Sequence, residues 1–129
     1  TIPVYANGDV VTPEHARDIL AVTGADGVLV GRGAFGAPWR LMQMQDMVDG
    51  RPVRPDPDDG WKWQLALKQF RHSLQHYGEE LGRRVIRKHL GWYAEQAGLP
   101  KAVRDELVRS TNAEVVLERL ASGQHAEAA

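Results

Sequence analysis

IPVYANGD at residues 2–9 and GVLVGR at residues 27–32 are the two stretches that decide the fold. Each begins as a short apolar run of strand length and ends in a glycine turn. The segment between them has the apolar spacing of an amphipathic helix. The order strand, helix, strand is typical of one βαβ unit, so the start of the chain predicts an α/β fold.

A single βαβ unit is not a complete domain. Strands that are apolar on both faces pack in larger parallel sheets under covering helices, either in doubly wound sheets or in eight-stranded barrels. No other stretch of the 129 residues reads convincingly as a strand. We therefore expect residues 1–50 to be the last part of a larger α/β domain.

The first helix has clear start and stop signals. Thr12 can cap free amides, and Pro13 suits the first helical position because its missing N–H is not needed there. The helix should run to about Thr23 and end at Gly24. We expect its apolar face to contain Ala16, Ile19, Leu20 and Val22.

The turn GRGAFG at residues 31–36 has two interpretations. It can be a tight turn only, since short glycine-rich turns are common. It can also bind an anion, with glycine amides and the Arg32 guanidinium as donors. The loop Asn7, Gly8 and Asp9 should leave the same carboxyl edge of the sheet, which favours a phosphate site that includes Gly31. We expect Asp9 to cap amides or hold Arg32 rather than transfer a proton.

The second half of the chain changes character. Residues 51–58 contain three prolines and no apolar period, which predicts a linker. Residues 59–123 should form a small helical bundle, and residues 124–129 a disordered tail. The helices should span residues 59–77, 80–97, 100–108 and about 112–120, with a stripe on the first at Trp61, Leu65, Leu67, Phe70 and Leu74.

The helix at residues 80–97 is strongly basic. Its cations are spaced so that like charges stack at i and i+4, which invites an anionic partner such as RNA or DNA; they are Arg83, Arg84, Arg87 and Lys88. We expect the cations to point outward, and the inward side to carry Leu81, Val85, Trp92 and His89. The alternative is a solvated surface balanced by Glu79, Glu80 and Glu95.

Composition excludes several kinds of protein. Cysteine is absent, so the chain offers no disulfide and no thiol acid or nucleophile. The net charge of −1 says nothing about nucleic acid, and no apolar run is long enough to span a membrane, so the cytoplasm is the default compartment. His72 and His76 have no carboxylate that completes a metal site.

Taken together, several motifs resemble the C-terminal half of bacterial tRNA-dihydrouridine synthases of the nitrogen-regulation-associated subgroup. These motifs are IPVYANGD, TGADGVLVGRGA, the pair Pro38–Trp39, Arg87-Lys88-His89 and Trp92–Tyr93. The likeness extends from Ile2 to about Leu120.

The resemblance implies a flavin enzyme, an oxidoreductase that reduces a tRNA uridine to dihydrouridine with NADPH and FMN. Its fold would be a (β/α)₈ TIM barrel, of which this chain holds the last βαβ portion, followed by an all-α tRNA-binding domain. FMN would be bound by Asn7, Gly8, Asp9, Gly31 and Arg32. The family's proton-donating cysteine has no counterpart here, so we expect the chain alone to be inactive.

Two alternatives remain open. Another FMN barrel acting on a small molecule would share the two loops but would have no need of a basic helical domain. A non-catalytic nucleic-acid-binding or protein-interaction module would need only the helices.

Overall fold

The computed structural model describes residues 1–122; the predicted tail at residues 124–129 lies outside that range. The chain divides into two compact units, Thr1–Asp56 and Pro57–Ala129, and each is described by itself. Within the described residues the protein is mostly helical, with six α-helices and one two-stranded parallel sheet. The mixture of a small α/β part and a helical part follows the order expected from the sequence.

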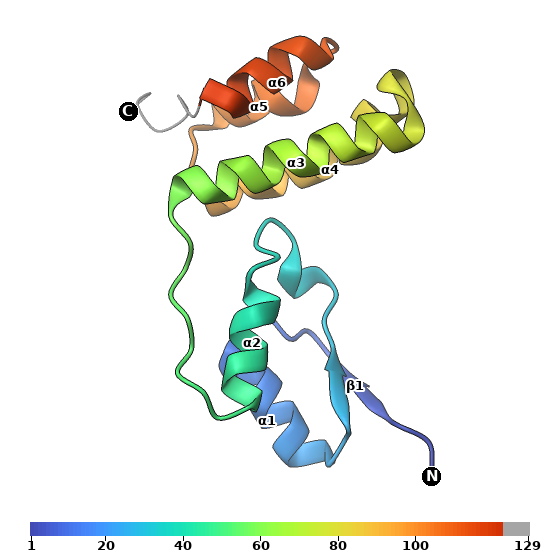
Figure 1. Cartoon of the computed structure of the whole chain (residues 1–129), viewed down its shortest axis with the longest axis vertical. Coiled ribbons are helices and arrows are strands. Elements are labelled where there is room, and N and C mark those ends of the chain that lie inside the picture. Colours follow the sequence, from blue (N-terminus) through green and yellow to red (C-terminus); the bar gives the residue numbers. More distant parts are fainter. Residues whose placement is uncertain (123–129) are drawn as a thin grey trace. The chain divides into compact units, whose positions relative to one another are not determined.

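The first unit contains five elements in chain order (Figure 1). They are β1 (Tyr5–Asn7), α1 (Pro13–Thr23), β2 (Gly27–Leu29), the 3₁₀ turn η1 (Arg32–Ala34) and α2 (Arg40–Val48). The predicted strand–helix–strand order is confirmed, with strands β1 and β2 running parallel.

Both ends of α1 form as predicted. The Thr12 hydroxyl accepts a hydrogen bond from the His15 amide at 3.1 Å, with Pro13 at the start of the helix. Gly24 ends the helix at φ 66°, a left-handed conformation that glycine adopts without steric cost. Local chemistry alone is sufficient to set these boundaries.

The core of the first unit lies between the helices and one face of the sheet. Val10, Ala16 and Met44 are buried there, with Ile19, Val28 and Val30 packed around them. Val22, which we expected on the same face, is 86% exposed. It follows Ala16 by six residues, a rotation that leaves it about 120° away from the buried stripe.

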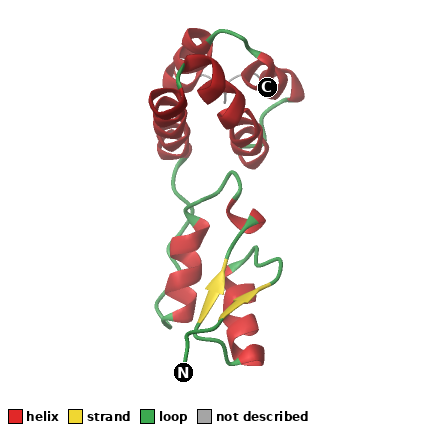
Figure 2. Ribbon diagram, turned by 90° about the vertical axis from the view of Figure 1, so that its right-hand side faces the viewer, coloured by secondary structure: helices red, strands yellow, loops and turns green. Residues whose placement is uncertain are grey.

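The helical unit is formed by α3 (Asp59–Tyr77), α4 (Glu79–Gln96), α5 (Lys101–Arg109) and α6 (Ala113–Ser122). Helix α3 packs against α4 and α6, and α5 packs against α4. Figure 2 draws these helices in red, joined by loops in green. The largest fully buried side chains are Phe70, Leu90, Val116 and Leu120. The predicted helix positions are confirmed to within one or two residues at each end.

The buried stripe of α3 differs from the expected one. Leu67 and Phe70 are buried as predicted, but Trp61 is exposed and Trp63 takes its place in the core. The buried positions are Trp63, Ala66, Leu67, Phe70 and Ser73. These residues recur at three- and four-residue steps, and Trp61 belongs to another side of the helix.

No helix within residues 1–122 is both long enough and apolar enough to cross a lipid bilayer.

Candidate functional site

The two predicted loops leave the same edge of the sheet. Tyr5 pairs with Gly27 and Asn7 pairs with Leu29 in parallel register, so both strands end side by side. Gly8 and Asp9 follow β1 directly, and Gly31 and Arg32 follow β2 after Val30. The predicted neighbourhood of the loops is therefore confirmed.

Backbone packing keeps the two loops in contact. A Cβ atom at Gly33 would lie only 1.9 Å from the carbonyl oxygen of Val10, where no side chain fits. Gly33 is buried, and its missing side chain lets the turn after β2 lie directly on the segment after β1. The glycine content of residues 31–36 thus has a packing role at this position.

An ion pair also joins the loops. Nη2 of Arg32 donates to Oδ1 of Asp9 at 2.7 Å, and the two side chains are 78% and 80% exposed. Asp9 has φ 40°, a left-handed conformation in which Asp is found more often than most residues. The expectation that Asp9 holds Arg32 is confirmed.

This pair can exchange partners at little cost. Exposed ion pairs contribute about 0–1 kcal/mol, so a phosphate dianion can displace Asp9 from the Arg32 guanidinium. Gly31 has open space where a side chain would be, which leaves room for a ligand beside the backbone. A fork of guanidinium donors next to an open glycine is chemically suited to a phosphate group.

The four cations of α4 have different environments. Arg83 is half-buried and its Nη1 donates to the Ser110 carbonyl oxygen at 3.2 Å, so it ties α4 to the connection between α5 and α6. Arg84 reaches Glu80 at 3.9 Å on the surface. Within the described part of the chain, Arg87 and Lys88 have neither an ion pair nor a side-chain hydrogen bond. Arg83 thus has a structural contact that Arg84, Arg87 and Lys88 lack.

The inward face of α4 is not the one we expected. Leu81 and Val85 are 50% and 43% exposed, whereas Ile86, Leu90 and Tyr93 are buried. Gly82 determines this orientation because it packs on the backbone of α3 at Ser73 and Leu74. The orientation of α4 about its axis therefore places Gly82, and not Leu81, against α3.

His89 and Trp92 lie at the margin of this core. Both are half-buried, and their rings meet edge to face with centroids 5.0 Å apart. Burial lowers the pKa of His89 below its ordinary value, which favours the neutral imidazole. A packed histidine was expected at this position, and its setting gives no sign of a catalytic base.

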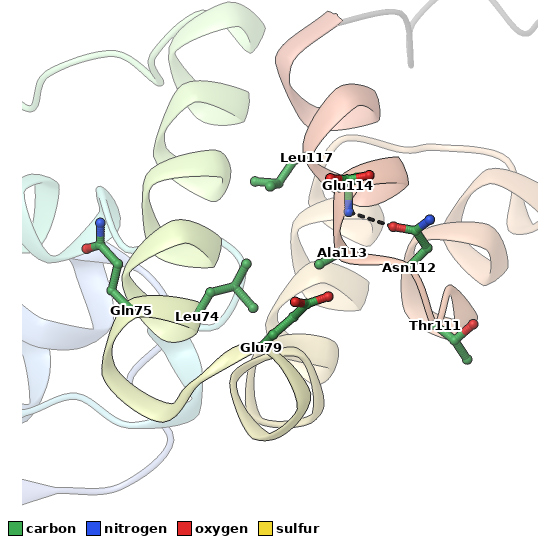
Figure 3. A pocket seen from close by; sticks show the side chains of 8 residues that line it. All are labelled: Leu74, Gln75, Glu79, Thr111, Asn112, Ala113, Glu114 and Leu117. Carbon is green, nitrogen blue, oxygen red and sulfur yellow. Dashed lines mark hydrogen bonds between the residues drawn. The ribbon is translucent and has the colours of Figure 1, made fainter.

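One hollow of the helical unit is lined by none of the residues predicted to bind FMN or tRNA (Figure 3). It measures about 740 Å³ and is lined by Leu74, Gln75, Glu79, Thr111, Asn112, Ala113, Glu114 and Leu117. Oδ1 of Asn112, just before α6, accepts a hydrogen bond at 2.9 Å from the backbone amide of Glu114 within the first turn of α6. The carboxylates of Glu79 and Glu114 make the hollow unsuitable for a phosphate.

Comparison with known proteins matches almost the whole chain to one family. The family model described as "Dihydrouridine synthase (Dus)" covers residues 1–128. The chain belongs to the dihydrouridine synthase family.

Individual members of the dihydrouridine synthase family are also similar. A probable tRNA-dihydrouridine synthase of Rhodobacter capsulatus is 41% identical over 122 residues, which are 95% of this chain and 37% of the relative. The tRNA-dihydrouridine synthase B of Pseudomonas putida is 39% identical over 93 residues, or 72% of this chain and 28% of the relative. The chain spans about a third of the length of the curated relatives it matches.

Sequence reasoning missed one buried cluster in this dihydrouridine synthase family member. The side chain of Asp46 is 4% exposed. Its carboxylate accepts hydrogen bonds from Nε of Arg54 at 2.6 Å, from Nη2 of Arg54 at 2.8 Å and from Nη2 of Arg51 at 3.0 Å. Gln43 donates to the Arg54 carbonyl oxygen and to Asp56. The sequence pattern that could have indicated this cluster is an aspartate in the helix at residues 40–48 that is followed five and eight residues later by arginines.

Proposed function

We propose that this chain supplies the FMN-phosphate loops and the tRNA-binding helical domain of a flavin-dependent tRNA-dihydrouridine synthase. The intact enzyme would reduce a uridine in tRNA to 5,6-dihydrouridine, with NADPH as reductant. Family membership and the names of the relatives support the reaction. The observation that carries the role of this chain is the Arg32–Asp9 contact, which joins the loops after two adjacent parallel strands.

The first unit would be the last βαβ portion of a TIM barrel, with the remaining strands supplied by a longer polypeptide. The face of the sheet opposite the helices supports this, because Tyr5 and Leu29 are exposed on it although both are large and apolar. Side chains on the inner face of a barrel meet those of other strands. In our proposal, residues 1–50 belong to the barrel, residues 51–58 are the connection and residues 59–123 are the tRNA-binding domain.

The residues at the loop edge fit an FMN phosphate. Arg32 would bind it through two guanidinium donors, while Asn7, Gly8, Asp9 and Gly31 would line the same site. When bound, FMN supplies hydride transfer between the nicotinamide and the uracil ring. In our proposal the proton donor to the uracil is the cysteine that the family resemblance implies, which this sequence lacks, so the chain would be inactive alone.

The tRNA would contact the outer side of α4. Arg84, Arg87 and Lys88 are available for phosphates there, whereas Arg83 is already bound to the Ser110 carbonyl oxygen and would act by holding the helices together. The weak Arg84–Glu80 contact at 3.9 Å can open when a phosphate approaches.

FMN binding to the intact enzyme tests the phosphate site. We expect Arg32→Ala to weaken FMN binding about tenfold or more, since a hydrogen bond to a charged group contributes roughly 1.5–3 kcal/mol. Arg17→Ala is the matched control, because Arg17 is also an exposed arginine paired with an aspartate, Asp18, in the same unit. Equal FMN affinities for the two variants would refute the proposed clamp.

A further inference from the structure

A second cationic surface lies on α3, a different helix from the one that carries Arg83, Arg84, Arg87 and Lys88. Lys68, Arg71 and His72 are all exposed and recur at three- and four-residue steps, so they share one side of the helix. They line a hollow of about 400 Å³ together with Gln64, Leu67 and Gln75. None of these six residues is acidic.

In the part of the chain that the structure describes, no carboxylate lines the α3 surface. By contrast, three other arginines of the helical unit have carboxylate partners: Arg104 lies 2.8 Å from Glu95, Arg119 lies 2.8 Å from Glu106 and Arg84 lies 3.9 Å from Glu80. Within residues 1–122, Lys68 and Arg71 have no such ion pair. Like charges one turn apart on a helix repel each other, and an anionic ligand relieves that repulsion.

The shape and chemistry of the hollow favour a polyanion over a folded protein. Gln64 and Gln75 place amide groups at its two ends, and eleven residues of helix separate them by about 16 Å. The only apolar lining residue is Leu67, which is almost fully buried. Protein-binding surfaces usually present aromatic or aliphatic anchors at their centre, and this surface presents none.

We propose that the α3 surface formed by Gln64, Lys68, Arg71, His72 and Gln75 binds the phosphate backbone of RNA as a contact separate from α4. This inference rests on the proposed function, because it takes the RNA to be the tRNA substrate. Lys68 and Arg71 supply the charge, and the two glutamines donate to phosphate or ribose oxygens. The contact is independent of base sequence, as backbone contacts are.

Salt-dependent binding of an unmodified tRNA transcript to the intact enzyme tests the surface. We expect Lys68→Gln with Arg71→Gln to weaken binding about tenfold at moderate salt, and to reduce the slope of log K against log salt by about 2, one for each lost phosphate contact. Lys101→Gln with Arg109→Gln is the matched control, because it also removes one lysine and one arginine charge, here from exposed positions on α5. The control should change the affinity less than twofold.

A third variant, Arg84→Gln with Lys88→Gln, separates the two proposals. If it weakens binding while the α3 variant behaves like the α5 control, the α3 surface is refuted and the proposed tRNA-binding role of α4 stands. If the unsubstituted enzyme shows no salt-dependent tRNA binding, both fail. Competition by polyglutamate as strong as that by tRNA would assign the α3 surface to an acidic protein instead. Thermal unfolding should show that all three variants are folded.

Discussion

Nε of Arg54 donates to the carboxylate of Asp46 at 2.6 Å, and the backbone amide of Arg54 donates to the same carboxylate at 3.2 Å. The side chain of Asp46 is on α2, and Arg54 lies in a segment without helix or strand. One buried acid thus binds both the side chain and the main chain of a segment that follows it by eight residues. As a result, residues 51–56 of the connection pack with the first compact unit.

We predict that Asp46→Asn releases this segment. The amides of Arg51 and Arg54, which donate to the Asp46 carbonyl oxygen and carboxylate, should then lose protection from hydrogen exchange. Gln45→Ala removes a side chain that bonds only Asp49 on the surface, and it should leave both amides protected. Unchanged exchange in Asp46→Asn would show that the ion pairs do not hold the segment.

The same cluster predicts an acid-sensitive opening. Hydrogen bonds from Arg54 and Arg51 hold the pKa of Asp46 well below its ordinary value of 3.8. A carboxyl whose pKa is lower in the folded state stabilises the fold fully above its unfolded pKa, and this stabilisation is lost as pH falls below that value. Exchange at the Arg54 amide should therefore become faster, relative to the intrinsic rate, as pH drops below about 4. In Asp46→Asn this pH dependence should disappear.

Gly82→Ala should destabilise the helical unit. A methyl group there would lie 2.5 Å from the Ser73 carbonyl oxygen and 2.8 Å from the Leu74 Cα, both backbone atoms, so α3 and α4 must move apart. We expect a loss of about 1–3 kcal/mol in the free energy of unfolding. Gly91→Ala is the control within the same helix, since its methyl would meet only side-chain atoms, those of Val108 at 3.4 Å and Arg104 at 4.0 Å. Chemical denaturation of both variants decides the matter, and equal stabilities would contradict the close approach.

Tyr93→Phe should remove a buried tie between α3 and α4. The Tyr93 hydroxyl donates to Gln69 Oε1 at 2.9 Å, and a hydrogen bond of this kind contributes about 1 kcal/mol. Burial raises the pKa of Tyr93 from 10.0 to about 12. The contribution of the Tyr93 hydroxyl to the free energy of unfolding should be complete below pH 10 and lost as the pH rises from 10 towards 12. The reason is that Tyr93 loses its proton at a lower pH in the unfolded chain than in the folded one. Denaturation at several alkaline pH values should show this loss in the natural chain and not in Tyr93→Phe.

Arg83→Gln and Arg84→Gln should affect different properties, the first stability and the second tRNA binding. The first removes the bond to the Ser110 carbonyl oxygen and should lower the free energy of unfolding by about 1 kcal/mol, whereas the second breaks only an exposed contact with Glu80 and should leave stability unchanged. Salt-dependent tRNA binding should be weaker in Arg84→Gln. If Arg83→Gln were as stable as the natural chain, Arg83 would have no structural role.

Much of the candidate phosphate site could be predicted because its geometry follows from strand order. Parallel strands joined by a helix place their carboxyl ends together, so Asn7 at the end of β1 and Arg32 just after β2 had to lie at the same edge of the sheet. The ion pair between Asp9 and Arg32 was a natural consequence of opposite charges in those loops. The direct backbone contact at Gly33 was not predictable, because several glycines in the turn were equivalent candidates.

The basic helix shows the limit of pattern reasoning. Two apolar sets on α4, one with Leu81 and Val85 and the other with Ile86 and Leu90, were compatible with a helical period, and only the second is buried. Likewise, nothing in the sequence indicates that Arg83 bonds a backbone carbonyl oxygen whereas the adjacent Arg84 lies on the surface. The spacing of Lys68 and Arg71 on one side of a helix could be recognised in the sequence. Whether acidic residues lie beside them depends on which helices surround that side, which the sequence does not show.

By itself the sequence determined where helices and strands begin and end, since caps such as Thr12, stops such as Gly24 and apolar periods act over a few residues. Only the tertiary structure decided which face of each helix is buried and which charges are paired. Those outcomes depend on contacts between residues far apart in the chain, such as Gly82 on the Ser73 backbone and Arg83 on the Ser110 carbonyl oxygen. A residue's own neighbours in the sequence do not encode them.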